Sequence, residues 1–350
     1  MSQKTERIII PRQVIKILKE KNMRFIIRQM KETVERARTI AAFAMAALLA
    51  LFLGGCSDSG SYLLESCVNP LKPVEFIQPD GYRSLAYNFK IGNRQPDTVL
   101  FFIGGSGCHS LKYYLRQYLD GLSGNIAVFA LQKRAVGDRM TGIFGCPPGF
   151  WKSDYFDQWL SDQSAFIART LNAIQPAPKR AAIASVSEGA MTAAAIAAAN
   201  KNITHLVIIG AGGMKQIDEL RLLTSNNESP GDIEVKYREI GADPGNTEKT
   251  LYDHSFKYWS SVLAVDPLLY FEKIEVPVII GFGEADTSVP VESTLLLKER
   301  MRSMGKTNVN LIIYPGADHA LKAGKHNYRK AFFQAVSKWL RQPAASSAIR

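Results

Sequence analysis

Cysteine and histidine are scarce in this chain of 350 residues, which contains four Cys and five His. No two cysteines lie close together in the sequence, and no two histidines have the spacing of zinc ligands. Structural zinc sites usually draw on such closely spaced pairs. The sequence therefore does not support a zinc protein, and we expect neither a metal nor a cofactor.

A basic stripe interleaved with aromatic residues is also lacking beyond the first segment of the chain. The net charge is +11, but residues 1–40 hold eleven Lys and Arg against four Glu, a net +7, which leaves only +4 for all that follows. Proteins that bind nucleic acid usually gather their positive charge on a folded face. We therefore expect no nucleic-acid partner.

A membrane-spanning apolar run is lacking as well. The longest apolar run, residues 40–53, has fourteen residues, whereas a spanning helix needs about 20. A short apolar run behind a basic segment is typical of a signal peptide, with a buried helix or a plain membrane anchor as the alternatives. The run ends in "LGGC", residues 53–56, which resembles the lipobox of bacterial lipoproteins. That resemblance implies lipidation of Cys56, and Ser57 after it resembles the pattern of lipoproteins on the periplasmic face of the outer membrane.

The chain is expected to divide into four parts. Residues 1–55 are interpreted as a signal peptide with a long basic start, and residues 56–73 as the lipidated cysteine with a flexible polar tether. Residues 74–341 form the predicted folded domain, and residues 342–350 a disordered tail. The membrane is thus an expected partner, through the lipid anchor.

The predicted domain is α/β. Apolar runs such as "TVLFFIGG", "NIAVFALQK" and "HLVIIGAG" alternate with amphipathic segments, which indicates a doubly wound, mostly parallel sheet with helices on both faces. The Asp-Gly pair of "PDGY" predicts an antiparallel hairpin at its start. Residues 213–275, after the sixth strand, are far longer than a crossover needs. We expect a helical, lid-like insertion there, with ordinary packing helices as the alternative.

Two serines in "AAIASVSEGA" follow a predicted strand. A nucleophile on a sharp strand-to-helix turn needs small residues two positions away on either side. Ser187 has Ser185 and Gly189 there, whereas Ser185 would have the β-branched Ile183. Ser187 is therefore the candidate nucleophile, although a plain strand-turn-helix would have a similar sequence.

A serine nucleophile needs a base and an orienting acid. His319 follows the last predicted strand, "NLIIY", and is preferred as the base over His326. The loop after the preceding strand, "GEADTSVP", offers Glu284 and Asp286. We prefer Asp286, which lies further into the loop; its alternative role is to cap the following helix.

A tetrahedral oxyanion requires convergent backbone N–H groups. One would come from Glu188, directly after the nucleophile, and the other from the glycine-rich loop "GGSGC", with Ser106 preferred and Gly105 second. A phosphate-binding loop is the competing interpretation, but the G-x-x-x-x-G-K-[ST] pattern is not present.

These motifs, in this order, resemble those of the α/β-hydrolase superfamily. The resemblance covers "GGSG", "SVSEGA", "GEADTSVP" and "YPGADHAL", and the order Ser187, Asp286, His319 matches the order of nucleophile, acid and histidine in that superfamily. It implies cleavage of a small acyl substrate, by default a carboxylic ester, through an acyl-enzyme. Thioesterase and peptidase activities stay open, but a prolyl-oligopeptidase-type enzyme with a propeller is excluded by length. "QKRAVG" resembles a D-x-R-G-x-G loop, from which Gln132 and Ala135 depart.

The resemblance carries two further implications. Cys108 and Cys146 follow two strands that are neighbours in sheets of this superfamily, so we expect a disulfide between them, with Cys67 as the alternative partner. Aromatic residues of the insertion form a substrate wall or belong to the core; they are Tyr252, Phe256, Tyr258 and Trp259. A different class of function, a non-catalytic binding or envelope-assembly lipoprotein, also stays open because fold does not fix function.

Overall fold

The computed structural model describes residues 71–142, 145–224 and 230–342. The predicted signal peptide, Cys56, Cys67 and nearly all of the tether and tail lie outside the described residues. Within the described part, none of the helices is both long and apolar enough to span a bilayer.

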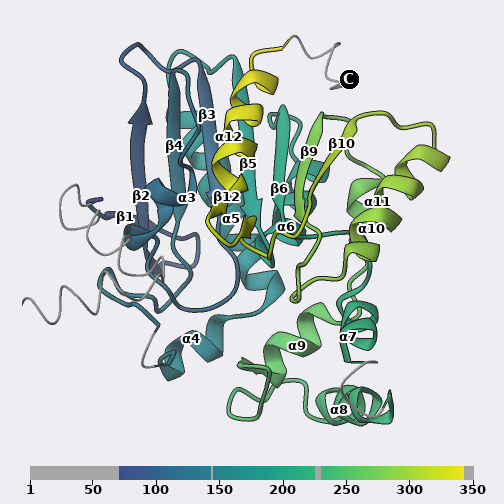
Figure 1. Ribbon diagram of the computed structural model, residues 1–350. Helices are drawn as coiled ribbons and strands as arrows, with labels where there is room; N and C mark the ends of the chain where they lie inside the picture. The colour runs from purple at the N-terminus through teal and green to yellow at the C-terminus, as the bar shows by residue number, and fades with distance from the viewer. Residues whose placement is uncertain (1–70, 143–144, 225–229, 343–350) are drawn as a thin grey trace, which may run out of the picture. The chain divides into compact units, whose positions relative to one another are not determined.

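One eight-stranded sheet organises the domain (Figure 1), with the strand order β1-β2-β4-β3-β5-β6-β9-β10. β1 and β2 form an antiparallel hairpin, β2 pairs antiparallel with β4, and all other neighbours are parallel. The predicted doubly wound, mostly parallel sheet with an antiparallel start is confirmed. The strands are β1 Val74–Ile77, β2 Arg83–Ile91, β3 Thr98–Ile103, β4 Ile126–Leu131, β5 Arg180–Val186, β6 His205–Ile209, β9 Val278–Gly283 and β10 Val309–Tyr314.

Helices cover both faces of this sheet because its central strands are apolar on both sides. In β3, Phe101 and Ile103 pack toward one core cluster, while Leu100 and Phe102 pack toward the other. The first cluster includes residues of α5, α6, α10 and α11, and the second includes residues of α3 and α12. These helices are α3 Leu115–Tyr118, α5 Phe156–Ala173, α6 Gly189–Ala199, α10 Leu268–Phe271, α11 Val291–Ser303 and α12 Tyr328–Trp339.

The long segment between β6 and β9 contains four helices and a small hairpin in its described residues. Its helices α7, α8 and α9 lie beyond one end of the sheet, on the side where α4 also lies (Figure 1). The bounds are α4 Pro148–Ser153, α7 Gln216–Thr224, α8 Pro230–Ala242, β7 Thr250–Leu251, β8 His254–Ser255 and α9 Phe256–Val262. The rest are the 3₁₀ helix η1 Leu111–Tyr113 and a second hairpin, β11 Lys322–Ala323 with β12 His326–Asn327.

Candidate active site

Ser187 occupies a sharp turn between β5 and α6. Its φ angle is 53°, in the left-handed region that residues with a Cβ rarely adopt. Its N–H donates to the carbonyl of Ile209 on β6 at 2.9 Å, and its own carbonyl accepts from the Ala190 N–H at 2.9 Å. The turn is thus fixed on both sides. This is the conformation of a strand-to-helix nucleophile elbow.

The rival serine lies in a different environment. The Ser185 side chain is buried, and its hydroxyl donates to the Val207 carbonyl at 3.3 Å inside the sheet. Ser187, by contrast, lines a pocket. Only Ser187 of the two is therefore accessible to a substrate.

His319 and Asp286 meet beyond the ends of β10 and β9. The His319 Nδ1 lies 2.7 Å from the Asp286 Oδ2. The other carboxylate oxygen of Asp286 accepts from the Ser288 and Val289 N–H groups at 2.8 and 3.0 Å. An ionised carboxylate only accepts hydrogen bonds, so Nδ1 is the donor in this pair and Nε2 is left as a potential base. Asp286 thereby fixes the turn ahead of α11 and orients the imidazole.

The imidazole of His319 also lies next to the turn that holds Ser187. A Cβ added to Gly210 would lie 2.8 Å from the His319 Cε1, and Gly210 directly follows Ile209, the partner of the Ser187 N–H. Within the described residues, however, Ser187 Oγ makes no hydrogen bond to His319. Such bonds are often long in unliganded enzymes and shorten when substrate binds.

The predicted oxyanion groups lie beside the nucleophile. A Cβ added to Gly105 would come within 3.3 Å of the Ser187 Cβ, and the next residue, Ser106, lines the same pocket as Ser187 and Glu188. Among the residues that the structure describes, neither the Ser106 nor the Glu188 N–H donates a hydrogen bond. Both N–H groups are therefore available to an oxyanion.

The other candidates of the sequence analysis lie elsewhere. His326 is exposed on the small β12 strand, where it pairs with Ala323. Glu284 is exposed, and its carboxylate accepts from the Gly316 N–H at 3.1 Å. Neither residue is among those that line the pocket at Ser187. His319 and Asp286 are not among them either, and what distinguishes these two residues is their 2.7 Å contact with each other.

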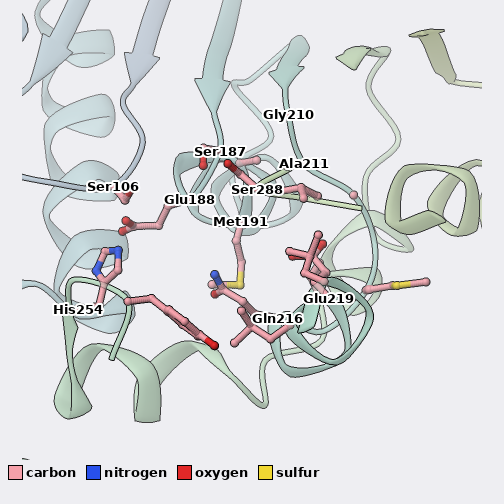
Figure 2. A pocket seen from close by; sticks show the side chains of 18 of the residues that line it. Ser106, Ser187, Glu188, Met191, Gly210, Ala211, Gln216, Glu219, His254 and Ser288 are labelled. Carbon is pink, nitrogen blue, oxygen red and sulfur yellow. The ribbon is translucent and has the colours of Figure 1, made fainter. Parts of the chain in front are cut away.

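A pocket of about 480 Å³ opens at Ser187 and extends under the insertion (Figure 2). Tyr252, Tyr258 and Trp259 line it, as expected for a substrate wall. Phe256 does not line the pocket; it is buried in a core cluster of the insertion to which Tyr258 and Trp259 also belong. His254, which the sequence analysis did not select, stacks on Tyr258 with ring centroids 3.9 Å apart and also lines the pocket.

The sequence analysis also missed a buried ion network that includes Glu188, the residue after the nucleophile. The Lys133 ammonium donates to Asp154 at 2.8 Å and to both carboxylate oxygens of Glu188 at 2.8 and 3.0 Å. His254 Nδ1 lies 3.6 Å from the second oxygen of Asp154. The only signal for this network was a lysine at the carboxyl end of an apolar strand, since its partners lie 21 and 55 residues away.

The network sets the charges around Glu188. Burial raises the pKa of Glu188, with help from the nearby Asp154 and against the effect of Lys133. Burial also acts to raise the pKa of Asp154, but Lys133 and His254 outweigh it and the pKa is lowered. For Lys133, burial acts to lower the pKa, and the two carboxylates reverse that effect. The Glu188 side chain is thus paired with a buried cation.

The loops around the site are joined covalently and by hydrogen bonds. Cys108 and Cys146 form a disulfide with a Cα–Cα distance of 5.6 Å. Gln132 accepts from the Leu111 N–H at 2.7 Å and donates to the His109 carbonyl at 3.1 Å. These contacts hold the segment that follows the glycine-rich loop. The described residues contain no group of three or more potential metal ligands.

Comparison with known proteins decides the family. A model of the prolyl oligopeptidase family matches residues 151–347, more than half of the chain. The chain belongs to the prolyl oligopeptidase family. It is therefore a serine hydrolase of the α/β-hydrolase superfamily. The match begins in α4 and includes Ser187, Asp286 and His319.

Solved structures of similar fold include esterases and a peptidase. Est1E from Butyrivibrio proteoclasticus is 16% identical, with a TM-score of 0.53 over 77% of this chain and 97% of its own. An esterase of Pyrococcus furiosus is 20% identical, with a TM-score of 0.52 over 77% and 89%. The acylaminoacyl peptidase of Pyrococcus horikoshii is 14% identical, with a TM-score of 0.52 over 80% of this chain but only 43% of its own. At these identities the likeness concerns the fold. None of the curated proteins matches the chain.

Family membership refines the expectation drawn from the sequence. The sequence analysis expected a carboxylic ester hydrolase and left a peptidase-type activity open. The matched segment contains "SVSEGA", "GEADTSVP" and "YPGADHAL", whereas "GGSG" precedes it. Membership in a family named for a peptidase leaves the choice between ester and peptide bonds open.

Proposed function

We propose that this protein cleaves an acyl bond, by default a carboxylic ester, with Ser187, His319 and Asp286 as its catalytic residues. The observation that carries the proposal is the 2.7 Å contact between His319 Nδ1 and Asp286 Oδ2 beside a serine in a strained left-handed turn. A carboxylate that fixes Nδ1–H leaves Nε2 free to accept the serine proton.

The proposed reaction has two steps. Ser187 Oγ attacks the carbonyl carbon while His319 Nε2 takes its proton, and the negative oxygen accepts hydrogen bonds from the Ser106 and Glu188 N–H groups. His319 then gives the proton to the leaving group, whose bond to the carbonyl carbon breaks, and Ser187 is left acylated. Water, activated by the same imidazole, hydrolyses the acyl-enzyme and restores the serine.

Covalent labelling tests the nucleophile. A fluorophosphonate probe should label the purified full-length chain and the Ser185→Ala variant, but not Ser187→Ala. Turnover of a 4-nitrophenyl ester should follow the same pattern, with a loss of several orders of magnitude on removing Ser187. Labelling that survives in Ser187→Ala, or disappears in Ser185→Ala, would contradict the assignment. A chain that takes up no probe at all would favour the non-catalytic binding function.

Peptide cleavage is the second candidate, because the family is named for a peptidase. A 4-nitrophenyl ester and a 4-nitroanilide of the same acyl group measure the preference. The esterase proposal expects turnover of the ester and little turnover of the anilide after correction for their uncatalysed rates. A corrected anilide rate equal to or above the ester rate would assign the protein to the peptidases.

We also propose that the protein is anchored through a lipid on Cys56, on the periplasmic face of the outer membrane. The support is the "LGGC" sequence behind a fourteen-residue apolar run. A palmitate analogue fed to expressing bacteria should mark the wild type and Cys67→Ala but not Cys56→Ala. Equal labelling of all three chains would contradict the anchor.

A further inference from the structure

The pocket at Ser187 is lined by two carboxylates, and only one of them is paired with a lysine. Two carboxylates line it, those of Glu188 and Glu219, and neither lysine nor arginine is among the lining residues. Glu188 is paired with the buried Lys133 at 2.8 Å. Glu219 has no such partner among the described residues, since its only hydrogen-bond partner there is a hydroxyl.

The Glu219 carboxylate is held in a defined position. Glu219 lies on α7, and its Oε1 accepts from the Ser293 hydroxyl at 2.6 Å. Ser293 is fully buried at the start of α11, and its own oxygen accepts from the Met214 N–H at 3.0 Å. This contact fixes one oxygen, while Oε2 has no partner within the part of the chain described. A carboxylate with one oxygen fixed and one free is oriented for a ligand.

The surroundings of Glu219 disfavour the charged form of its carboxylate unless a cation is close to it. Burial raises the pKa of Glu219 to about 7. The hydrogen bond from Ser293 and the nearby His319 act against this increase, and the negative charge of Asp286 adds to it. A cation within a few ångströms would reverse that effect, because it favours the charged form. Among the described residues that line the pocket, no lysine or arginine lies beside the Glu219 carboxylate, and its charge therefore favours binding of a cation there.

The remaining wall restricts the rest of the ligand. Figure 2 shows Glu188 and Glu219 on opposite sides of the pocket, with Met191 and Gln216 between them. Most of the other lining side chains are aliphatic or aromatic, among them Leu220, Leu223, Val289, Trp259 and Phe271. A ligand that fits has an apolar body and one positive group with N–H donors.

We infer that Glu219 is a specificity-determining residue that accepts a protonated amine on an otherwise apolar acyl substrate. That the bound molecule is a substrate rests on the proposed function, but binding of an ammonium group at Glu219 can be measured without catalysis. A purely structural role, linking α7 to α11 through Ser293, is the competing explanation.

Two probes of equal length separate these explanations: the n-hexylammonium ion and 1-hexanol. In the full-length chain at about pH 8, we expect the ammonium ion to inhibit ester turnover at a concentration at least about tenfold lower than the alcohol, the factor that a charged hydrogen bond supplies. Glu219→Gln should remove this preference. Asp218→Asn is the matched control, because it removes a charge from the same helix at a residue that pairs with Arg221 and does not line the pocket.

The same two probes are then compared by how far each raises the melting temperature of Ser187→Ala. This measurement needs no turnover. A preference for the ammonium ion there supports the inference even if the esterase proposal fails. Should Glu219→Gln not fold, Glu219→Met tests the same loss of charge. Equal effects of ammonium and alcohol on the wild-type glutamate, a preference retained in both Glu219 variants, or an equal loss in Asp218→Asn would each overturn the inference.

Discussion

Ser187 combines a chemical role with an unfavourable backbone conformation. Its φ of 53° costs a residue with a Cβ about 1 kcal/mol or more, a penalty that glycine avoids. The neighbouring strand holds the turn in place through the Ser187 N–H to Ile209 hydrogen bond. Part of the stability of the domain is thus given up to project one hydroxyl into the pocket.

This strain predicts an ordering of two inactive variants. Ser187→Ala and Ser187→Gly should both lose turnover, but Ser187→Gly should be the more stable by about 1 kcal/mol, because glycine adopts the left-handed region without a steric penalty. Urea titrations of both chains measure the difference as a shift in midpoint at unchanged slope. An alanine variant as stable as the glycine variant would show that the turn stores no strain.

At the scale of elements, the site depends on how closely α6 approaches β3. A Cβ added to Gly189 would lie 2.4 Å from the Gly104 carbonyl oxygen and 2.7 Å from that of Ile103. Real Cβ atoms do not come so close to backbone oxygens, so the helix would have to move away from the strand. The glycine-rich loop that carries Gly105 and Ser106 begins at the same contact.

Gly189→Ala should therefore reduce both stability and activity. We expect a loss of about 2 kcal/mol or more in the free energy of unfolding, and a loss of turnover in the protein that stays folded, because the Glu188 and Ser106 N–H groups move apart. Thermal melting and ester turnover measure the two effects. Gly137→Ala is the control, since nothing lies within 4 Å of the added Cβ there; equal behaviour of the two variants would contradict the argument.

The elements themselves were largely readable from the sequence. Runs such as "TVLFFI" and "HLVII" became β3 and β6 because continuous apolar strands need a sheet covered on both faces. The segment "LKYYLRQYLDGL" forms η1 and a four-residue α3 rather than one longer helix. The Ser110 side chain caps η1, and the left-handed Gly121 follows α3.

Side-chain partners were less predictable than strands. The periodicity of a strand or helix is a local property, whereas the contacts of Lys133 with Asp154 and Glu188 join three separate segments. Phe256 and Trp259 are aromatic residues three positions apart on the same helix, yet only Trp259 lines the pocket. Which aromatic residue faces a cavity depends on the packing of the whole insertion, and the sequence pattern does not contain that information.

At the scale of the whole molecule, two buried groups make opposite contributions to the pH dependence of stability. His205 begins β6, with its ring edge against Trp339, and burial lowers its pKa from 6.5 to about 4. Burial raises the pKa of Glu219 from 4.5 to about 7. The histidine is thus kept neutral in the folded state, and the glutamic acid is kept protonated until near neutral pH.

The signs follow from proton binding in the two states. Between about pH 4 and 6.5 the unfolded chain protonates His205 and the folded chain does not, so this histidine makes stability rise with pH. Between about pH 4.5 and 7 the folded chain keeps the Glu219 proton that the unfolded chain has lost, so this glutamate makes stability fall with pH. Over the shared interval the two contributions nearly cancel in the wild type.

Single variants should therefore reveal opposite slopes that the wild type conceals. From pH 4.5 to 6.5, the stability of His205→Gln relative to the wild type should decrease, and that of Glu219→Gln should increase, each by at most about 3 kcal/mol. The double variant should follow the wild type, because His205 begins β6 whereas Glu219 lies on α7, after the other end of that strand, so the two residues act independently and their opposite contributions cancel. Urea unfolding of the four chains at several pH values measures the slopes. Relative stabilities that stay flat, or that change in the same direction for both single variants, would show that these groups do not titrate as their burial requires.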